Sequence, residues 1–435
     1  MTVGSHDSQI KLEVSLFPGE TIDDLRPKES PHLTDAQLNK RYVEEGVRIV
    51  VEQARYPLNQ ILTMFTDTFV TESGKTEAKY KRDPEYQRRH RWDDGRKSRL
   101  IESFLMNVPV PPIFLYEYDL ARFEVMDGRQ RLTALMDFYG SSLELTDLQY
   151  WPELNGRTYS TLPSSIRDGI DRRYLSSIIL LNETGATEEQ AAFLKKLVFE
   201  RLNSGGVRLS GQETRNAVYN GPLNDLCLEL SRTTELRAML GTPLDVESVV
   251  NSDDAEESDD VAAPEQDSEG VEVTRMGRKM FESMDDVEIV LRFYAYRHLA
   301  KFYQGLNRIS DSLDEFLKAG NKFDSRILED YRQLFLDNIK LWYAVNGATA
   351  FQVKGSNRHF SKIAYDALMY ASSALTTEQR ALLSSNPGIV RSEIDAMYNG
   401  NAAVFGGRRT NTTDANRRND CAIKALSSAL SVIGS

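Results

Sequence analysis

The chain is poor in the residues that build disulfides and metal centres. Its 435 residues include only two cysteines, Cys227 and Cys421, which lie far apart in sequence. This count argues against a disulfide scaffold and against a cysteine-based zinc site, and it is typical of a reducing compartment. The sequence also lacks a long apolar run, and its first residues lack the basic and apolar regions of a signal peptide. We therefore expect a cytoplasmic protein with no membrane partner.

The formal net charge of −12 comes mostly from one segment. Residues 245–270 hold eleven Asp and Glu and no Lys or Arg, so removing them from −12 leaves about −1 for the rest of the chain. Because such a composition cannot build a packed core, we predict an acidic disordered insert at residues 241–275. The overall acidity therefore does not exclude a locally basic surface for a nucleotide or a nucleic acid.

Composition and periodicity divide the remaining residues into three parts. Residues 1–40 are polar and contain proline, which predicts a flexible arm. Residues 41–240 mix strand-like runs, such as "VRIVVE" and "YLSSIILLN", with amphipathic helical patterns. Residues 276–435 are mainly helical in pattern, as in "DDVEIVLRFYAYR". The predicted fold class is α+β, with a small mixed domain followed by a mainly helical domain.

One stretch, "EVMDGRQRLTAL" at residues 124–135, combines a turn with unusual chemistry. A strand-like run ends at Asp127, and a helical pattern starts almost at once. Gly128 permits a tight turn and close approach of a ligand. Arg129, Gln130 and Arg131 fall in the first helical turn, where backbone N–H groups and the helix dipole favour phosphate. Asp127 could hold a divalent metal or orient a water toward a phosphoryl group. The alternative is that Asp127 caps the helix and the arginines form a solvated face.

A second cluster, "EYQRRHRW" at residues 85–92, places aromatic rings beside guanidinium groups. Tyr86 or Trp92 could stack on a base, and Arg88 could hold a phosphate. The alternative is a loop whose aromatic residues anchor it to the core.

Four motifs in fixed order carry a resemblance to a known family. They are "YQRRHRW", "LIESFLMNVPVPPIFLYE", "FEVMDGRQRLTAL" and "FERLNSGGVRLSGQETRNAVYNG". Together they resemble the N-terminal domain family of GmrSD-type restriction systems, which has a ParB/sulfiredoxin-like fold. This resemblance implies nucleotide-driven defence against phage and foreign DNA. In that family an Asp-Gly-Gln-Gln-Arg box binds and hydrolyses a nucleoside triphosphate, and a separate HNH nuclease domain cuts DNA.

The resemblance also implies site residues. The implied catalytic residues are Asp127, Gln130 and Arg131, with Asp127 also the ligand of Mg²⁺ that accompanies the triphosphate. The implied nucleotide-binding residues are Tyr86, Gln87, Arg88, Gly128, Arg129, Asn203 and Arg215. A helix end explains Asn203 without a ligand. The chain departs from the family at Arg129, where glutamine is commoner. An added guanidinium favours phosphate binding, whereas the loss of one of two glutamines bears on hydrolysis.

The histidine pattern differs from that of an HNH nuclease, which needs clustered histidines to activate water and hold a metal. The five histidines are scattered at positions 6, 32, 90, 298 and 359. We therefore expect no intrinsic nuclease. The sequence predicts a nucleoside-triphosphate-binding and hydrolysing protein that switches its helical domain or a partner nuclease. The alternative is a non-catalytic DNA- or protein-binding sensor module with the same fold.

Overall fold

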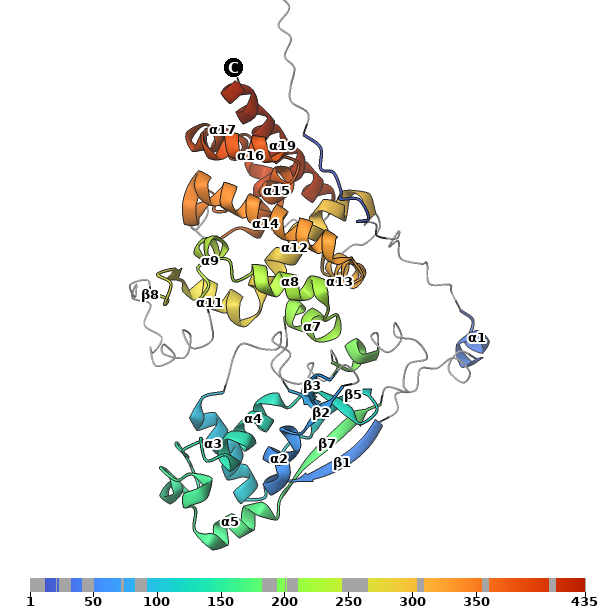
Figure 1. Cartoon of the computed structure of the whole chain (residues 1–435), viewed down its shortest axis with the longest axis vertical. Coiled ribbons are helices and arrows are strands. Elements are labelled where there is room, and N and C mark those ends of the chain that lie inside the picture. Colours follow the sequence, from blue (N-terminus) through green and yellow to red (C-terminus); the bar gives the residue numbers. More distant parts are fainter. Residues whose placement is uncertain are drawn as a thin grey trace, which may run out of the picture. The chain divides into compact units, whose positions relative to one another are not determined.

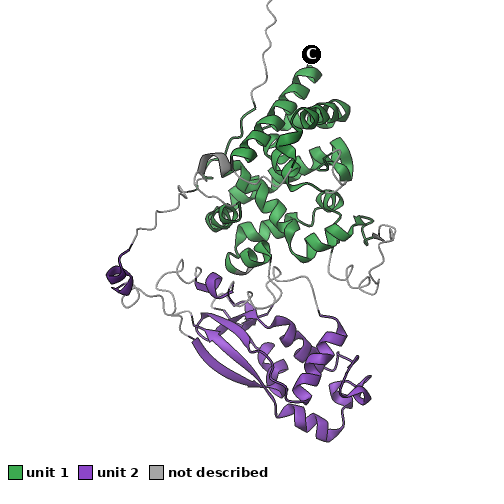
Figure 2. Cartoon of the chain, turned by 180° about the vertical axis from the view of Figure 1, so that it is seen from behind, with its two compact units in different colours: residues 1–30, 210–435 green, residues 31–209 purple. Residues whose placement is uncertain are grey.

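The computed structural model describes residues 12–20, 22, 33–40, 51–71, 74–82, 92–181, 194–199, 201, 210–244, 265–302, 309–353, 360–406 and 412–434. The chain forms two compact units (Figure 2). Residues 31–209 are called the sheet unit below. Residues 1–30 and 210–435 together are called the helical unit. Each unit is described by itself.

A five-stranded mixed sheet organises the sheet unit (Figure 1). Its order is β1 (Val51–Pro57), β7 (Tyr174–Leu180), β5 (Ile113–Asp119), β6 (Arg122–Asp127) and β4 (Tyr80–Lys81). The pairs β7–β5 and β6–β4 are parallel, whereas β1–β7 and β5–β6 are antiparallel. Strands β5 and β6 follow each other in the chain and form an antiparallel hairpin. The strand predicted at 47–52 overlaps β1 only at the beginning of β1.

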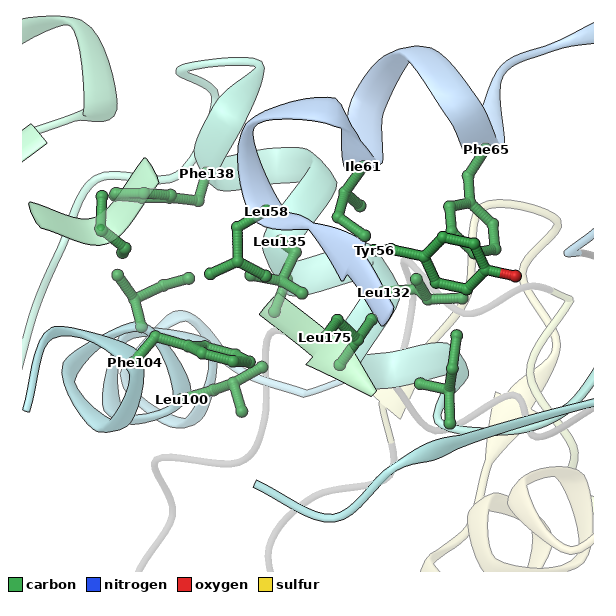
Figure 3. Packing of buried hydrophobic residues seen from close by; sticks show 14 of the residues in the cluster. Tyr56, Leu58, Ile61, Phe65, Leu100, Phe104, Leu132, Leu135, Phe138 and Leu175 are labelled. Atoms are coloured by element: carbon green, nitrogen blue, oxygen red, sulfur yellow. The ribbon is translucent and has the colours of Figure 1, made fainter. Parts of the chain in front are cut away.

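Helices enclose the core on one face of this sheet. The main ones are α2 (Ile61–Phe65), α3 (Asp94–Leu105), α4 (Arg129–Tyr139) and α5 (Ser164–Asp171), with the short helices η2 (Leu58–Gln60), η3 (Pro152–Leu154) and η4 (Tyr159–Thr161). Leu100 and Phe104 of α3 meet Leu135 and Phe138 of α4 in the hydrophobic cluster (Figure 3). Full burial of one such side chain contributes about 1.5–3 kcal/mol. This packing fixes α4, and with it the turn that precedes α4.

Smaller elements complete the sheet unit. Strands β2 (Thr68–Val70) and β3 (Thr76–Ala78) form a separate antiparallel hairpin, and α1 (Asp35–Lys40) has no buried residue. Residues 194–199 are helical, with Leu194 and Phe199 buried.

Helices and one small hairpin make up the described helical unit. Its elements in chain order are α7 (Gly211–Val218), α8 (Pro222–Leu230), α9 (Thr234–Leu240), β8 (Glu265–Gln266), β9 (Glu272–Val273), α11 (Arg275–Glu282), α12 (Asp285–Phe302), α13 (Ile309–Gly320), α14 (Ser325–Asn346), η7 (Gly347–Thr349), α15 (Lys362–Ser372), α16 (Thr377–Ser384), α17 (Pro387–Gly400), α18 (Ala402–Phe405) and α19 (Thr412–Gly434). No described helix is both long and apolar enough to cross a lipid bilayer. The predicted α+β class is confirmed.

The structure divides the chain at residue 209, earlier than the boundary at 240 that the sequence suggests. Helix α8 packs on α12 and α14, and α9 packs on α14, so both belong to the helical unit. Part of the predicted arm also belongs there, because Leu12, Val14 and Glu20 are buried against it. The predicted acidic insert is described only at its two ends. The second end forms the β8–β9 hairpin, where buried Arg237 pairs with Asp267.

Candidate functional site

The turn between β6 and α4 allows only glycine at its centre. Gly128 has a φ of +92°, a left-handed conformation that side chains disfavour. A Cβ added there would lie 2.4 Å from Cγ2 of Ile113, the first residue of β5. The chain therefore passes from strand to helix within one residue, and α4 begins at Arg129. This places the positive end of the α4 dipole directly beside Asp127.

A β-bulge decides which way Asp127 faces. Residues of β6 pair with β5 as Glu124 with Tyr116, Val125 with Leu115, and Asp127 with Phe114. Two steps along β6 therefore match one step along β5, which is the signature of a bulge at this end of the strand. Because directly paired residues share a face of the sheet, Asp127 lies on the same face as Glu124. The core-forming Val125 lies on the other face.

Arg131 locks this turn to the beginning of β5. Its Nη2 donates to Oδ2 of Asp127 at 2.5 Å, and its Nη1 donates to the carbonyl oxygens of Pro111 at 2.5 Å and Pro112 at 3.0 Å. The Arg131 side chain is 13% exposed, whereas that of Asp127 is 43% exposed. Arg131 thus orients Asp127, and one carboxylate oxygen of Asp127 is committed to this ion pair.

Positive charge gathers beside Arg129. Burial, and then the neighbouring charge of Arg82, lower the pKa of the Arg129 guanidinium from its ordinary value. Arg82 follows the last residue of β4 and donates from Nη1 to the sulfur of Met136 on α4 at 2.9 Å. Like charges held close together at a helix N-terminus favour the binding of an anion. Sequence reasoning missed Arg82, because only the parallel pairing of β4 with β6 brings it there.

The two motifs that the sequence singled out meet at α4. The backbone N–H of Trp92 donates to Oε1 of Gln130 at 3.2 Å. Arg82, which precedes the upstream motif in sequence, and Trp92, which ends this motif, therefore both contact α4. Tyr86, Gln87 and Arg88 lie between these two contacts in sequence and outside the described residues. Trp92 itself is partly buried, with the Arg96 guanidinium 4.9 Å from its ring centre.

Arg215 lies in the helical unit, on α7. Its side chain is 3% exposed, and it donates to Asp314 at 2.8 Å, to Glu288 at 2.9 Å and to Gln212 at 3.0 Å. These partners account for its burial without a ligand. Its predicted role in nucleotide binding stays a prediction. Asn203 lies outside the described residues.

A second ion pair fastens the helix at 194–199 to the sheet. Nζ of Lys195 donates to Oε2 of Glu124 at 2.7 Å and lies 5.3 Å from the ring centre of Tyr116. Both charged side chains are about nine-tenths buried, with 13% and 10% exposed. Glu124 therefore serves an internal contact, and Asp127 is the more exposed carboxylate on this strand. Within the described part of the chain, no three His, Cys, Asp or Glu cluster as a metal site.

The fold and the site together define an α+β domain with a basic, glycine-hinged helix N-terminus beside a single oriented carboxylate. Residues 70–220, about a third of the chain, match the family model described as the GmrSD restriction endonuclease, N-terminal domain. The family assignment drawn from the four motifs is thereby confirmed for this part of the chain. The match begins in β2 and continues into α7, so it crosses the boundary between the two units. No curated protein and no solved structure matches the chain significantly. The ParB/sulfiredoxin-like likeness stays a prediction.

Proposed function

We propose that the sheet unit binds a nucleoside triphosphate with its phosphates at the N-terminus of α4, and that it hydrolyses this nucleotide to switch the helical unit or a partner nuclease. The observation that carries the proposal is the meeting of two motifs on one helix. Arg82 and Trp92, which bracket the upstream motif, contact Met136 and Gln130 of α4. Trp92 is thus held at the first turn of α4, the helix end suited to phosphate, and Arg82 contacts the same helix farther along.

Each residue of the box has a distinct task in this proposal. Gly128 lets the phosphates approach the backbone, and Arg129 with Arg82 supplies positive charge. Arg131 positions Asp127 through the 2.5 Å contact between them. Gln130 orients the attacking water through its amide. Tyr86, Gln87 and Arg88 of the upstream motif bind the base and the phosphates.

A magnesium ion fits this arrangement only if the phosphates of the nucleotide supply part of its ligands. Mg²⁺ is held in such sites by one or two carboxylates together with the phosphates of the nucleotide. Asp127 offers one exposed carboxylate with one oxygen already bound to Arg131. The ion would neutralise phosphate charge when bound, so it would enter with the nucleotide rather than before it.

The restriction family of the matched domain extends the proposal to defence against foreign DNA. Cutting would belong to a partner, and the nucleotide state would control it. A DNA- or protein-binding module without turnover remains the competing function. The contacts of Arg131 favour this competing function, because both terminal nitrogens of its guanidinium already bind Asp127, Pro111 and Pro112.

Titration with each of the four nucleoside triphosphates and Mg²⁺ tests the proposal, with phosphate release measured in parallel, with and without DNA. The variants are Arg129→Ala and Arg129→Gln, and the matched control is Arg99→Ala. Arg99 is exposed on α3 of the same unit, so its removal changes the charge equally.

The proposal expects binding and release by the wild type and by Arg99→Ala. It expects binding to weaken at least tenfold in Arg129→Ala, and turnover to rise in Arg129→Gln because a second glutamine can position water. Nucleotide binding without phosphate release in every variant would overturn the hydrolysis part of the proposal and leave a nucleotide-gated switch. No binding of any nucleotide by the folded wild type would overturn the proposal.

A further inference from the structure

A short segment near the beginning of the chain inserts a carboxylate into the helical unit. Its described residues, 12–20 and 22, are separated from the rest of this unit by the whole sheet unit in sequence. Leu12, Val14 and Ile22 are buried at 4–7% exposure, which anchors the segment at both ends. Between them, Glu20 is 1% exposed. These residues are called the strap below.

A turn aims Glu20 inward. The backbone N–H of Glu20 donates to the carbonyl oxygen of Phe17 at 3.0 Å, across Pro18 and Gly19. Gly19 has a φ of +88°, as the second central residue of such a turn requires. Oε2 of Glu20 accepts from the backbone N–H of Phe17 at 2.7 Å. One carboxylate oxygen therefore stabilises the turn, and the other points into the helices.

Three buried side chains donate hydrogen bonds to that second oxygen. Oε1 of Glu20 accepts from Tyr331 Oη at 2.5 Å, from His298 Nε2 at 2.6 Å and from Arg297 Nη1 at 3.1 Å. Arg297 and His298 come from α12, and Tyr331 comes from α14. The side chains of Arg297 and His298 are at most 1% exposed. The helices thus line the Glu20 carboxylate with Arg297, His298 and Tyr331, and the buried Arg297 guanidinium supplies positive charge to this pocket.

The strap also contacts the pocket through its backbone and an aromatic ring. Nη2 of Arg297 donates to the carbonyl oxygen of Ser15 at 2.8 Å, and its guanidinium lies 4.9 Å from the ring centre of Phe17. The Phe17 and Tyr331 rings pack with centres 6.1 Å apart. The pocket therefore recognises a peptide that turns between an aromatic residue and a glutamate three positions later.

We propose that this pocket is a binding site for an acidic peptide, filled by the strap of the same chain, and that the strap is a releasable clasp. The sheet unit is joined to the helical unit at residue 210 by the covalent chain. With the strap seated, it is joined a second time through Glu20. When the strap is released, only the covalent connection at residue 210 remains. Occupancy of the pocket therefore controls whether the sheet unit is joined to the helical unit once or twice. This inference does not rest on the proposed nucleotide site.

The test uses the full chain with a specific protease site placed between residues 23 and 32. After cleavage, the fragment that carries the strap is held by the clasp alone. We expect it to co-elute with the remainder of the protein in gel filtration. A labelled synthetic peptide of residues 10–24 should displace it and give an affinity by titration.

Two altered peptides make the test specific, because the substitutions are made in the peptide alone and the pocket of the cleaved protein keeps its natural residues. Glu20→Gln in the peptide should weaken binding by about hundredfold, because it leaves Arg297 buried without its partner charge. Glu13→Gln makes the same charge change at an exposed residue of the strap and should bind within about twofold of the parent. Immediate loss of the strap fragment from the wild type, or equal binding of the Glu20→Gln and Glu13→Gln peptides, would overturn the proposal.

Discussion

Arg131 holds Asp127 across one turn of α4, with its Nη2 2.5 Å from Oδ2 of the carboxylate. The same guanidinium binds the carbonyl oxygens of Pro111 and Pro112, which precede β5. One side chain therefore joins the end of β6, the first turn of α4 and the entry to β5. Arg131 thus orients Asp127 in the folded chain, and the catalytic role that the family resemblance implies for Arg131 stays a prediction.

Replacing Arg131 should therefore affect folding as well as binding. Arg131→Ala removes the hydrogen bonds to Asp127, Pro111 and Pro112, and we expect a loss of roughly 2–4 kcal/mol in the free energy of unfolding. Urea denaturation followed by circular dichroism measures this loss. Arg99→Ala is the control and should change stability by less than about 0.5 kcal/mol. Equal stability of the two variants would show that the Arg131 contacts contribute little.

Gly128 can be tested against Gly74, a glycine with a similar positive φ. Gly128→Ala combines a positive φ with a clash against Ile113, whereas Gly74→Ala has a φ of +82° and open space around it. We expect about 1 kcal/mol of destabilisation for Gly74→Ala and at least about 2 kcal/mol more for Gly128→Ala. Thermal or urea unfolding of both variants checks the difference. Similar losses in the two would mean that the β6–α4 turn accommodates a side chain.

Arg215 separates a structural role from a nucleotide-binding role. Its contacts with Glu288 and Asp314 predict that Arg215→Ala lowers the free energy of unfolding by about 3–5 kcal/mol, because the substitution removes a buried guanidinium that pairs with both of these largely buried carboxylates. Nucleotide affinity, measured at a temperature where the variant is still folded, should be unchanged. A tenfold loss of affinity with normal stability would instead support the role that the sequence motif implies.

Stability should fall in acid through the same ion-pair network. Burial alone would raise the pKa of Glu288, but the charges of Arg215, Lys362 and Arg292 outweigh it and hold the pKa at about 2. Because this folded pKa lies below the unfolded value, the contribution is fully present above pH 4.5 and is lost as the pH falls toward 2. The difference corresponds to about 3 kcal/mol. The pKa of Glu20 is also lowered, chiefly by the His298 hydrogen bond and the Arg297 charge acting against burial.

Glu288→Gln should therefore reduce the acid sensitivity of the helical unit. Denaturation of the variant and the wild type between pH 2 and 6 measures the slope of stability against pH. The wild type should lose more stability than Glu288→Gln across that window. Parallel curves would assign the acid dependence to other carboxylates, Glu20 among them.

Local signals in the sequence predicted the central turn well. The strand ending at Asp127, the glycine at position 128 and the helix that follows are all encoded within a few residues, as is the capping box of Ser210 and Glu213. The contacts that complete the site come from distant segments instead. The contact between Arg82 and Met136 joins residues 54 positions apart, and it depends on the pairing of β4 with β6.

The domain boundary shows the same limit of local patterns. Residues 210–240 have helical patterns that fit either unit, and only their packing on α12 and α14 assigns them to the helical unit. The strap is a clearer case. A polar, proline-containing stretch predicts an arm, yet the partners of Glu20 lie more than 270 residues away in sequence.

Hydrogen–deuterium exchange of the full chain, with and without saturating nucleoside triphosphate and Mg²⁺, tests the central claim most directly, because it reports both binding and its location. The account predicts slower exchange in peptides that cover residues 126–135 and 82–92, and loss of this protection in Arg129→Ala. Nucleotide binding with no protection at α4, or protection confined to other segments, would contradict it.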